Sequence, residues 1–321
     1  MNRKNNNSRS VWLHTGIIVI LFVLQFVLPD YYHLSTTRVM VLAVFAMGYN
    51  VLFGYTGLLS LGHAMFFAAG LYTAGMVVYY LQFAVPLAFL CGIAAGAVLS
   101  LLVGLLALRA SGVSFMIITL MFSQVVHLAS LYFTTYTRGD EGLVLPQSAR
   151  SFELFGQIIE LTEPVTRYNI ALALLALTMC IVFVLVRGST GRALIAIREN
   201  EERTRMLGYN TFAIKLQALV ISGSISAAAG ATYALMFAYI GSSFATIQYS
   251  IDALLFTLLG GAGTILGPLL GTFLMFHLID FASDVTAAYF LVTGVVLIFL
   301  ILYFPRGLLG MVREKWLRWL P

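Results

Sequence analysis

The sequence contains no Asp, Glu, Lys or Arg between Val39 and Leu108. A helix needs about 20 predominantly apolar residues to cross a bilayer, so this stretch alone is long enough for about three crossings. Only 10% of the residues in the whole chain are charged, against about 25% in an average soluble domain. We therefore expect most of the chain to lie in a membrane.

Other uncharged stretches fill most of the remaining chain. They cover residues 10–29, 110–137, 168–186, 216–251, 253–279 and 285–305. Together with the first stretch they predict an all-α, polytopic integral membrane protein with about eight to ten transmembrane helices. Residues 1–321 are expected to form one transmembrane domain. The apolar run Val11–Leu28 should remain as an uncleaved span, because no small-residue cleavage site follows it.

The basic residues predict the orientation, since Lys and Arg are enriched in cytoplasmic loops. They gather in the N-terminal segment 1–10, at Arg109 and between residues 187 and 215, whereas the opposite face keeps only four arginines. We expect the N-terminus and the tail 306–321 to be cytoplasmic, which requires segment 251–280 to cross twice or to re-enter. The net charge of +5 is explained by these loops, so no nucleic-acid partner is expected.

Two segments are too polar for lipid. The first, residues 134–167, is of mixed charge and is placed on the outer face, as either a solvated connector or a docking surface. The second, residues 188–210, is expected to form one cytoplasmic helix. Glu199 and Glu201 each lie four residues before an arginine, the favourable order for ion pairs along a helix, and Gly208 suits a C-cap. Because a short connection would suffice there, we expect this helix to contact a partner.

Two glycine-rich interruptions lie in uncharged regions, one in each half of the chain. They are GYTGLLSLGHAMFFAAGLYTAG at 54–75 and GGAGTILGPLLG at 260–271. Paired breaks of this kind indicate a transport pathway, because backbone groups freed by a break must be buried in protein or line a cavity. Close helix packing through small residues is the alternative. The candidate pathway residues are Gly57, Ser60, Gly62, His63, Phe66, Gly260, Gly261, Gly263, Gly267 and Pro268.

Several kinds of chemistry have no motif in the sequence. No lysine follows a glycine, so the chain has no P-loop, and the five histidines have no metal-ligand spacing. We expect no catalytic residue, no metal site and no cofactor bound by this chain. Asp252 is the one fair candidate for an ion-coupling acid, and it lies near the end of a span. The pattern is therefore typical of a transport pathway that relies on a separate energy source.

Four ordered motifs carry a resemblance to a known family. They are the two glycine-rich segments, GRALIAIRENEERTRMLGYN at 191–210, and FPRGLLG at 304–310. They resemble the permease subunits of branched-chain amino acid ABC importers, and are most similar to the M-type (LivM-like) subunits. The resemblance covers nearly the whole chain from about residue 39.

The resemblance implies a set of partners. These are a homologous second permease, two cytoplasmic ATPases that use ATP, and a periplasmic or extracellular substrate-binding protein, in a bacterial inner membrane and its lipid. Segment 188–210 looks like the family's coupling helix, in which Glu202 and Gly208 keep the expected spacing and Arg203 and Thr204 replace two alanines. The implied ATPase-coupling residues are Arg192, Ile197, Arg198, Glu199, Asn200, Glu202, Leu207 and Gly208.

The same resemblance implies alternating access driven by the ATPases, with leucine, isoleucine, valine or similar apolar amino acids as the substrate. Related permeases are linked to urea, short amides and aromatic acids, so these remain alternatives. A rival of another class is an ion-coupled secondary transporter that acts alone through Asp252. A membrane scaffold is a third possibility, but it gives no reason for paired glycine breaks.

Overall fold

The computed structural model describes residues 2–154, 157–286, 288–304 and 307–315. Within them, seven helical segments are long and apolar enough to cross a membrane. They are α2 (Asp30–Asn50) with the π-helical turn η1 (Val51–Tyr55), α3 (Ala64–Leu81), α4 (Val85–Ala107), α5 (Val113–Tyr132), α7 (Pro164–Arg187), α10 (Thr211–Phe237) and α12 (Gly267–Val285). The predicted all-α polytopic fold is confirmed.

Shorter apolar helices complete the bundle. They are the Ser10–Leu24 part of α1 (Asn2–Leu24) and α11 (Ile247–Gly260), followed by α13 (Tyr289–Tyr303). Segment 251–280 thus forms the second part of α11 and most of α12, two helices that pack against each other. The first of these helices has 14 residues and the second has 19, so whether the segment crosses twice or re-enters stays a prediction.

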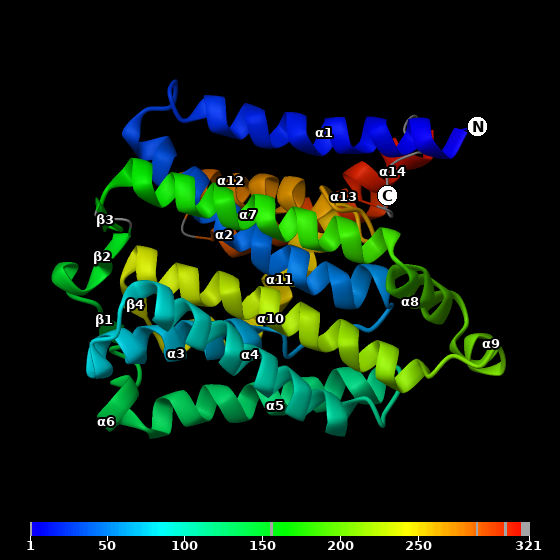
Figure 1. Ribbon diagram of the computed structural model, residues 1–321, viewed down its shortest axis with the longest axis horizontal. Helices are drawn as coiled ribbons and strands as arrows, with labels where there is room; N and C mark the ends of the chain where they lie inside the picture. Colours follow the sequence, from blue (N-terminus) through cyan, green and yellow to red (C-terminus); the bar gives the residue numbers. More distant parts are fainter. Residues whose placement is uncertain (1, 155–156, 287, 305–306, 316–321) are drawn as a thin grey trace.

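The helices run along the long axis of the molecule, so the bundle has two distinct ends (Figure 1). One end carries α8 (Ser189–Glu199), α9 (Glu201–Met206), α14 (Leu308–Lys315) and the start of α1, and is called the α8 end below. The other end, called the strand end, carries α6 (Thr134–Thr137) and the four short strands. All residues from 316 onwards and Arg306 lie outside the described residues.

Helix α10 lies at the centre of the bundle, in contact with α2, α3 and α4. Glycines let the backbones approach closely there. A Cβ on Gly70 would overlap the backbone of Ala227, and a Cβ on Gly230 would overlap the backbone of Phe67. Small residues at helix interfaces are the usual means of close packing in membranes. The core therefore has little room for side-chain adjustment where these helices cross.

Segment 134–167 is folded onto the bundle. Strand β1 (Leu143–Val144) pairs antiparallel with β4 (Tyr239–Ile240), and β2 (Ser151–Leu154) pairs with β3 (Gln157–Glu160). Between them, in the turn η2 (Gln147–Arg150), Arg150 is buried, and its Nη1 donates to the carbonyl of Met236 at 3.1 Å. A purely solvated connector therefore does not describe this segment. Its role as a docking surface stays a prediction.

The prediction of a single helix over residues 188–210 is wrong, because this segment forms two helices, α8 and α9. The chain bends at Asn200, whose extended backbone (φ −162°) ends α8 and whose side chain caps α9 by accepting from the backbone N–H of Arg203 at 2.9 Å. Asparagine followed by Glu201 and Glu202 is an N-cap pattern, and this local signal outweighs the helical ion pairs expected across the bend.

Candidate functional site

The first glycine-rich segment breaks the membrane helix as predicted. Helix α2 ends at Asn50, the π-helical turn η1 follows, and α3 begins only at Ala64. Gly57 has φ +77°, a conformation that side chains with a Cβ rarely adopt. Here the chain leaves the regular hydrogen-bonding pattern of a helix, so several backbone groups need other partners.

The second glycine-rich segment separates α11 from α12. Gly261 and Gly263 both have positive φ, +120° and +76°, and Pro268 occupies the first turn of α12. A Cβ on Gly260 would overlap the carbonyl oxygen of Gly267. The two helices therefore meet backbone to backbone at the turn, and only glycine fits there.

The structure brings the two breaks together through Asn50. Its Nδ2 donates to the carbonyl of Thr264 at 2.8 Å, and its Oδ1 accepts from the backbone N–H of Gly263 at 2.9 Å. Asn50 is almost fully buried, so both bonds satisfy backbone groups that the second break leaves without helical partners. Asn50 is not among the residues predicted for the pathway, although it is an isolated amide in a long uncharged stretch.

Two arginines from the α8 end also reach the breaks. The Nη1 of Arg198, on α8, donates to the carbonyl of Gly54, and the Nη1 of Arg313, on α14, donates to the carbonyl of Gly263 at 3.0 Å. The Cγ of Arg198 would lie 3.0 Å from a Cβ on Gly57. Helix α8 is therefore joined directly to the first break, and α14 to the second.

The remaining residues of the predicted pathway lie inside the packed bundle. Ser60, His63 and Phe66 are fully buried, and His63 Nε2 lies 2.8 Å from the Oγ of Ser226. A Cβ on Gly62 would overlap the backbone of Thr119. These contacts match the close-packing alternative as well as a closed pathway. Contact between these residues and a substrate stays a prediction.

The residues expected to couple to an ATPase point in different directions. Ile197 is buried against the bundle, whereas Leu207 is 75% exposed, next to Met206 at 84%. Arg192, Glu199 and Glu202 lie on the surface of α8 and α9, and Gly208 has φ +86° with open space around it. Helix α9 thus presents an apolar tip, which in a water-exposed position is typical of a contact with another protein.

An ion pair anchors α9 to the bundle, with a partner different from the one expected. Glu201 Oε1 lies 2.6 Å from Nζ of the buried Lys215, at the start of α10. Burial raises the pKa of Glu201. The hydrogen bond and the charge of Lys215, the hydrogen bond from Thr211 and the charge of Arg205 lower it by more, so the pKa lies below its usual value. Arg205 contributes to this charge, but Lys215 forms the ion pair.

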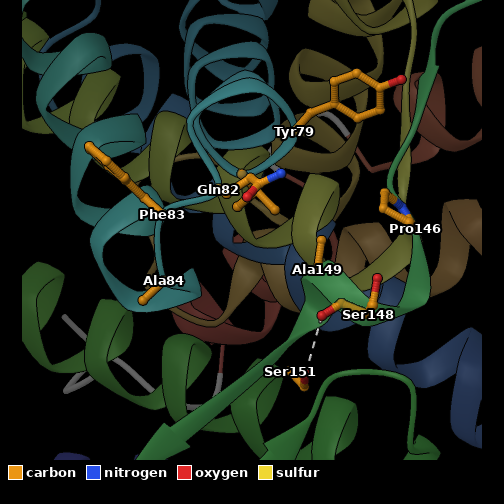
Figure 2. Close-up of a pocket in the computed structure, with 9 residues that line it drawn as sticks. Tyr79, Gln82, Phe83, Ala84, Pro146, Ser148, Ala149 and Ser151 are labelled. Carbon is orange, nitrogen blue, oxygen red and sulfur yellow. Dashed lines mark hydrogen bonds between the residues drawn. The ribbon is translucent and has the colours of Figure 1, made fainter.

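A second feature lies at the strand end. A cavity of about 400 Å³ separates the turn between α3 and α4 from the segment that leads into β2. Figure 2 shows Gln82, Phe83 and Ala84 on one side and Pro146, Ser148 and Ser151 on the other, with the Ser151 hydroxyl donating to the Ser148 carbonyl. Gln82 has φ +52°, so the turn is sharp. The cavity is therefore a polar recess at the strand end, far from α8.

Membrane-length helices packed around two joined helix breaks define a polytopic integral membrane protein. The sequence model of the family described as "Branched-chain amino acid transport system / permease component" matches residues 32–304. The chain belongs to this family. The resemblance found in the four motifs is thereby confirmed.

Individual relatives agree with the family match. The chain is 30% identical over 301 residues to the high-affinity branched-chain amino acid transport system permease protein LivM of Escherichia coli K12, covering 87% of this chain and 70% of LivM. It is 25% identical over 292 residues to LivH of Salmonella typhimurium, covering 84% and 91%. It is 29% identical over 211 residues to the fructose import permease protein FrcC of Rhizobium meliloti, covering 63% and 56%. No solved structure matches the chain.

Proposed function

We propose that this chain is the permease subunit of an ATP-driven ABC importer for branched-chain or other apolar amino acids. It works by alternating access with a second permease, two cytoplasmic ATPases and a substrate-binding protein. Family membership supports transport, and similarity to both LivM and LivH, two permeases of one named system, supports a second, homologous subunit. ATP is bound by the ATPases.

The observation that carries the proposal is the hydrogen bond between Arg198 and the carbonyl of Gly54. A movement imposed on α9 from outside passes along α8 to Arg198, and from there to the backbone of the first break. Asn50 then transmits it to the second break. Packed helices and hydrogen-bonded networks carry such coupling because they have few alternative arrangements.

The exposed tip of α9 is the proposed contact with an ATPase. Met206, Leu207 and Tyr209 are each at least half exposed, although they lie at or just beyond the end of a helix that is held in place by the Glu201–Lys215 ion pair. A rigid, apolar projection fits a groove on a partner. Arg198 acts behind this contact as the connection to the breaks.

The orientation follows from the ends of the bundle. The start of α1, the α8–α9 pair and α14 lie at one end (Figure 1), and most of the Lys and Arg residues belong to that end. Since basic loops stay inside, we place the α8 end in the cytoplasm. The strand end, with its polar cavity between the α3–α4 turn and η2, then faces the substrate-binding protein.

The substrate is proposed from the family description, which names branched-chain amino acids. FrcC is named as a fructose import permease, so similarity in this family does not by itself select a substrate. Urea, short amides and aromatic acids are the alternatives to test. Broken helices suit a zwitterion, since a helix N-terminus attracts a carboxylate and free carbonyls attract an ammonium group.

The experiment begins with purification of the chain from its native membrane in mild detergent, followed by identification of the proteins that accompany it. The complex is then placed in proteoliposomes, and uptake of labelled leucine is measured with and without ATP and with excess urea. We expect an ATPase and a second permease to co-purify, and uptake to require ATP.

Two variants make the test specific to α9. Gly208→Asp places a charge beside the apolar tip and should release the ATPase. Gly112→Asp is the matched control, because Gly112 also has positive φ (+58°) and no atom lies within 4 Å of the place that its Cβ would take. If the chain instead purifies alone and moves solute without ATP, the proposal is wrong, and an ion-coupled carrier that depends on Asp252 takes its place.

A further inference from the structure

A second charged feature lies at the side of the bundle, away from the glycine breaks. A cavity of about 310 Å³ lies between α2, α11 and α12. Its lining includes the charged residues Arg38 and Asp252 together with Tyr249, Phe45, Phe256 and Phe276. Charged side chains within membrane spans are costly, and by default they mark a functional site.

Arg38 has hydrogen-bonding capacity that the protein does not use. Its guanidinium carbon lies 5.1 Å from the ring centre of Phe237, which holds the group against the cavity wall. Its Nε is buried and has no hydrogen-bond partner among the described residues. A buried donor without a partner normally requires an explanation, and a ligand that brings an acceptor supplies one.

Asp252 brings the opposite charge to the same cavity. It lies in the second turn of α11, and its Oδ1 accepts one hydrogen bond from Nε2 of Gln248 at 3.1 Å. An ionised carboxylate can accept about four hydrogen bonds, so most of its capacity remains for a ligand. Asp280, on α12, lines the cavity as well and adds a second acidic group.

Apart from Ser283, the rest of the lining is apolar or aromatic. Leu42 and Phe45 come from α2, Phe256 from α11 and Phe276 from α12. Small-molecule sites commonly combine an apolar wall with a few polar groups that set the orientation, in cavities of about 300–1,000 Å³. An amino acid with an aliphatic side chain matches both the size and this division of the surface.

We propose that this cavity is a binding site for the zwitterionic form of an apolar α-amino acid. Arg38 binds the carboxylate, Asp252 binds the ammonium group, and the aromatic wall holds the side chain. Such a site is not apparent from the sequence, because Arg38 and Asp252 lie far apart in the chain and each alone resembles a residue at the end of a span.

The position of the cavity suits the first stage of import. Arg38 lies about 12 Å from the start of α2, at a rise of 1.5 Å per residue, and Asp252 lies near the start of α11. Both are therefore in the half of the bundle nearer the strand end, which the proposed function places outside. The site deepens that function by naming where a substrate is held, and it rests on it for the direction of access.

The test measures binding through protection of a thiol, independently of transport. In the assembled complex, Cys91 and Cys180, the only two cysteines in the sequence, are replaced by serine, and Ser283→Cys is introduced at the mouth of the cavity, where Ser283 is exposed. The rate of labelling by a maleimide is followed with leucine, with isoamylamine (leucine without its carboxylate), with 4-methylpentanoate (leucine without its amino group) and with urea.

We expect leucine to slow the labelling of Ser283→Cys, and both analogues to need concentrations roughly tenfold higher or more, as for the loss of one partner of a charge pair. Arg38→Gln and Asp252→Asn should each reduce protection by leucine to the level of the analogue that lacks the matching charge. Asp284→Cys is the control reporter, because it is exposed on the same helix but does not line the cavity. Its labelling should not respond to leucine.

Two results would overturn the proposal. One is unchanged labelling of Ser283→Cys at leucine concentrations that saturate uptake by the same complex. The other is protection by isoamylamine as strong as that by leucine, which would make this a site for cations alone. Arg38→Lys keeps the charge and should retain part of the protection, so a loss of folding in Arg38→Gln does not hide the answer. Protection by leucine in a complex without ATP-driven uptake would support the site and reject the importer.

Discussion

Each end of the bundle has an arginine whose side chain lies against the helices, and the two differ in their hydrogen bonding. One donates to a backbone carbonyl, and the other has a buried nitrogen without a partner among the described residues. At the α8 end, the guanidinium of Arg198 donates to the carbonyl of Gly54, in a region where Asn50 satisfies two further backbone groups. At the strand end, the Nε of Arg38 is buried beside a cavity, without a partner among the described residues. The α8 end uses its polar groups to hold the backbone, whereas the strand end keeps some of them free.

This difference separates a structural connection from a binding site. Buried polar groups that are fully paired make a region rigid, and removing one member leaves the others unsatisfied. Unpaired groups in a cavity cost the free protein stability, but they gain partners when a ligand arrives. We therefore expect substitutions at the α8 end to reduce stability and coupling, and substitutions at the strand end to reduce binding.

The largest effect is expected for Gly260→Ala. The added Cβ would overlap the carbonyl oxygen of Gly267, and two backbones cannot both move without separating α11 from α12. We expect a loss of about 3 kcal/mol or more, seen as a lower melting temperature of the detergent-purified protein. Gly294→Ala, in α13 with no atom within 4 Å of the new group, is the control and should be neutral or slightly stabilising.

Asn50→Ala should have the next largest effect. It leaves the N–H of Gly263 and the carbonyl of Thr264 buried without partners, at about 1–2 kcal/mol each. The expected loss of about 2–4 kcal/mol in the free energy of unfolding is measured by thermal unfolding. Asn169→Ala is the control, because Asn169 Nδ2 donates to the carbonyl of Val165 on the exposed surface of α7. Equal melting temperatures for the two variants would contradict the view that Asn50 joins the breaks.

Arg198→Lys tests the connection between α8 and the first break. Lysine keeps the charge but presents a single compact ammonium group on a different stem, so the bond to the Gly54 carbonyl is weakened. Under the proposed function, ATP hydrolysis by the complex should continue while leucine uptake falls by about tenfold, equivalent to about 1.4 kcal/mol. Arg203→Lys on the exposed side of α9 is the control. Parallel loss of hydrolysis and uptake would place Arg198 at the ATPase contact instead.

Glu201→Gln should show a dependence on pH. The folded state holds the pKa of Glu201 below its usual value, so the carboxylate stabilises the fold above about pH 4.5 and this contribution disappears as pH falls through the folded pKa. Because Glu201 is 34% exposed, we expect a difference from the wild type of only about 1 kcal/mol at neutral pH. Melting temperatures across the pH range should converge in acid. A constant difference would exclude the ion pair with Lys215 as the cause.

The smallest effect on stability is expected for Arg38→Gln. The packing of the guanidinium over Phe237 is lost, at about 0.5–1 kcal/mol, while a buried donor without a partner among the described residues is removed at the same time. The melting temperature should therefore change much less than in Asn50→Ala, although leucine protection is lost. If Arg38→Gln destabilises the protein as much as Asn50→Ala does, the two ends of the bundle do not differ in the way described above.

Much of the architecture was predictable from short-range features of the sequence. Uncharged stretches located the helices, and glycine clusters located both breaks, since lipid leaves few ways to satisfy a backbone. The bend at Asn200 was missed, although Asn200 followed by two glutamates is a recognisable N-cap pattern. The partner of Glu201 was also missed, because helical spacing favoured Arg205, while the buried ammonium of Lys215 comes from the next helix.

The amino-acid sequence alone is enough to predict a helical membrane protein with a broken helix in each half, and its motifs are enough to indicate the family. The reason is that transmembrane length, charge exclusion and glycine breaks act over a few turns of helix and are visible in a single stretch of chain. The hydrogen bond from Asn50 to Thr264, in the other half of the chain, and the cavity that Arg38 shares with Asp252 become visible only when the helices are packed together. Such contacts depend on which helices pack together and at what depth, and that follows from the complementary shapes of whole helix surfaces.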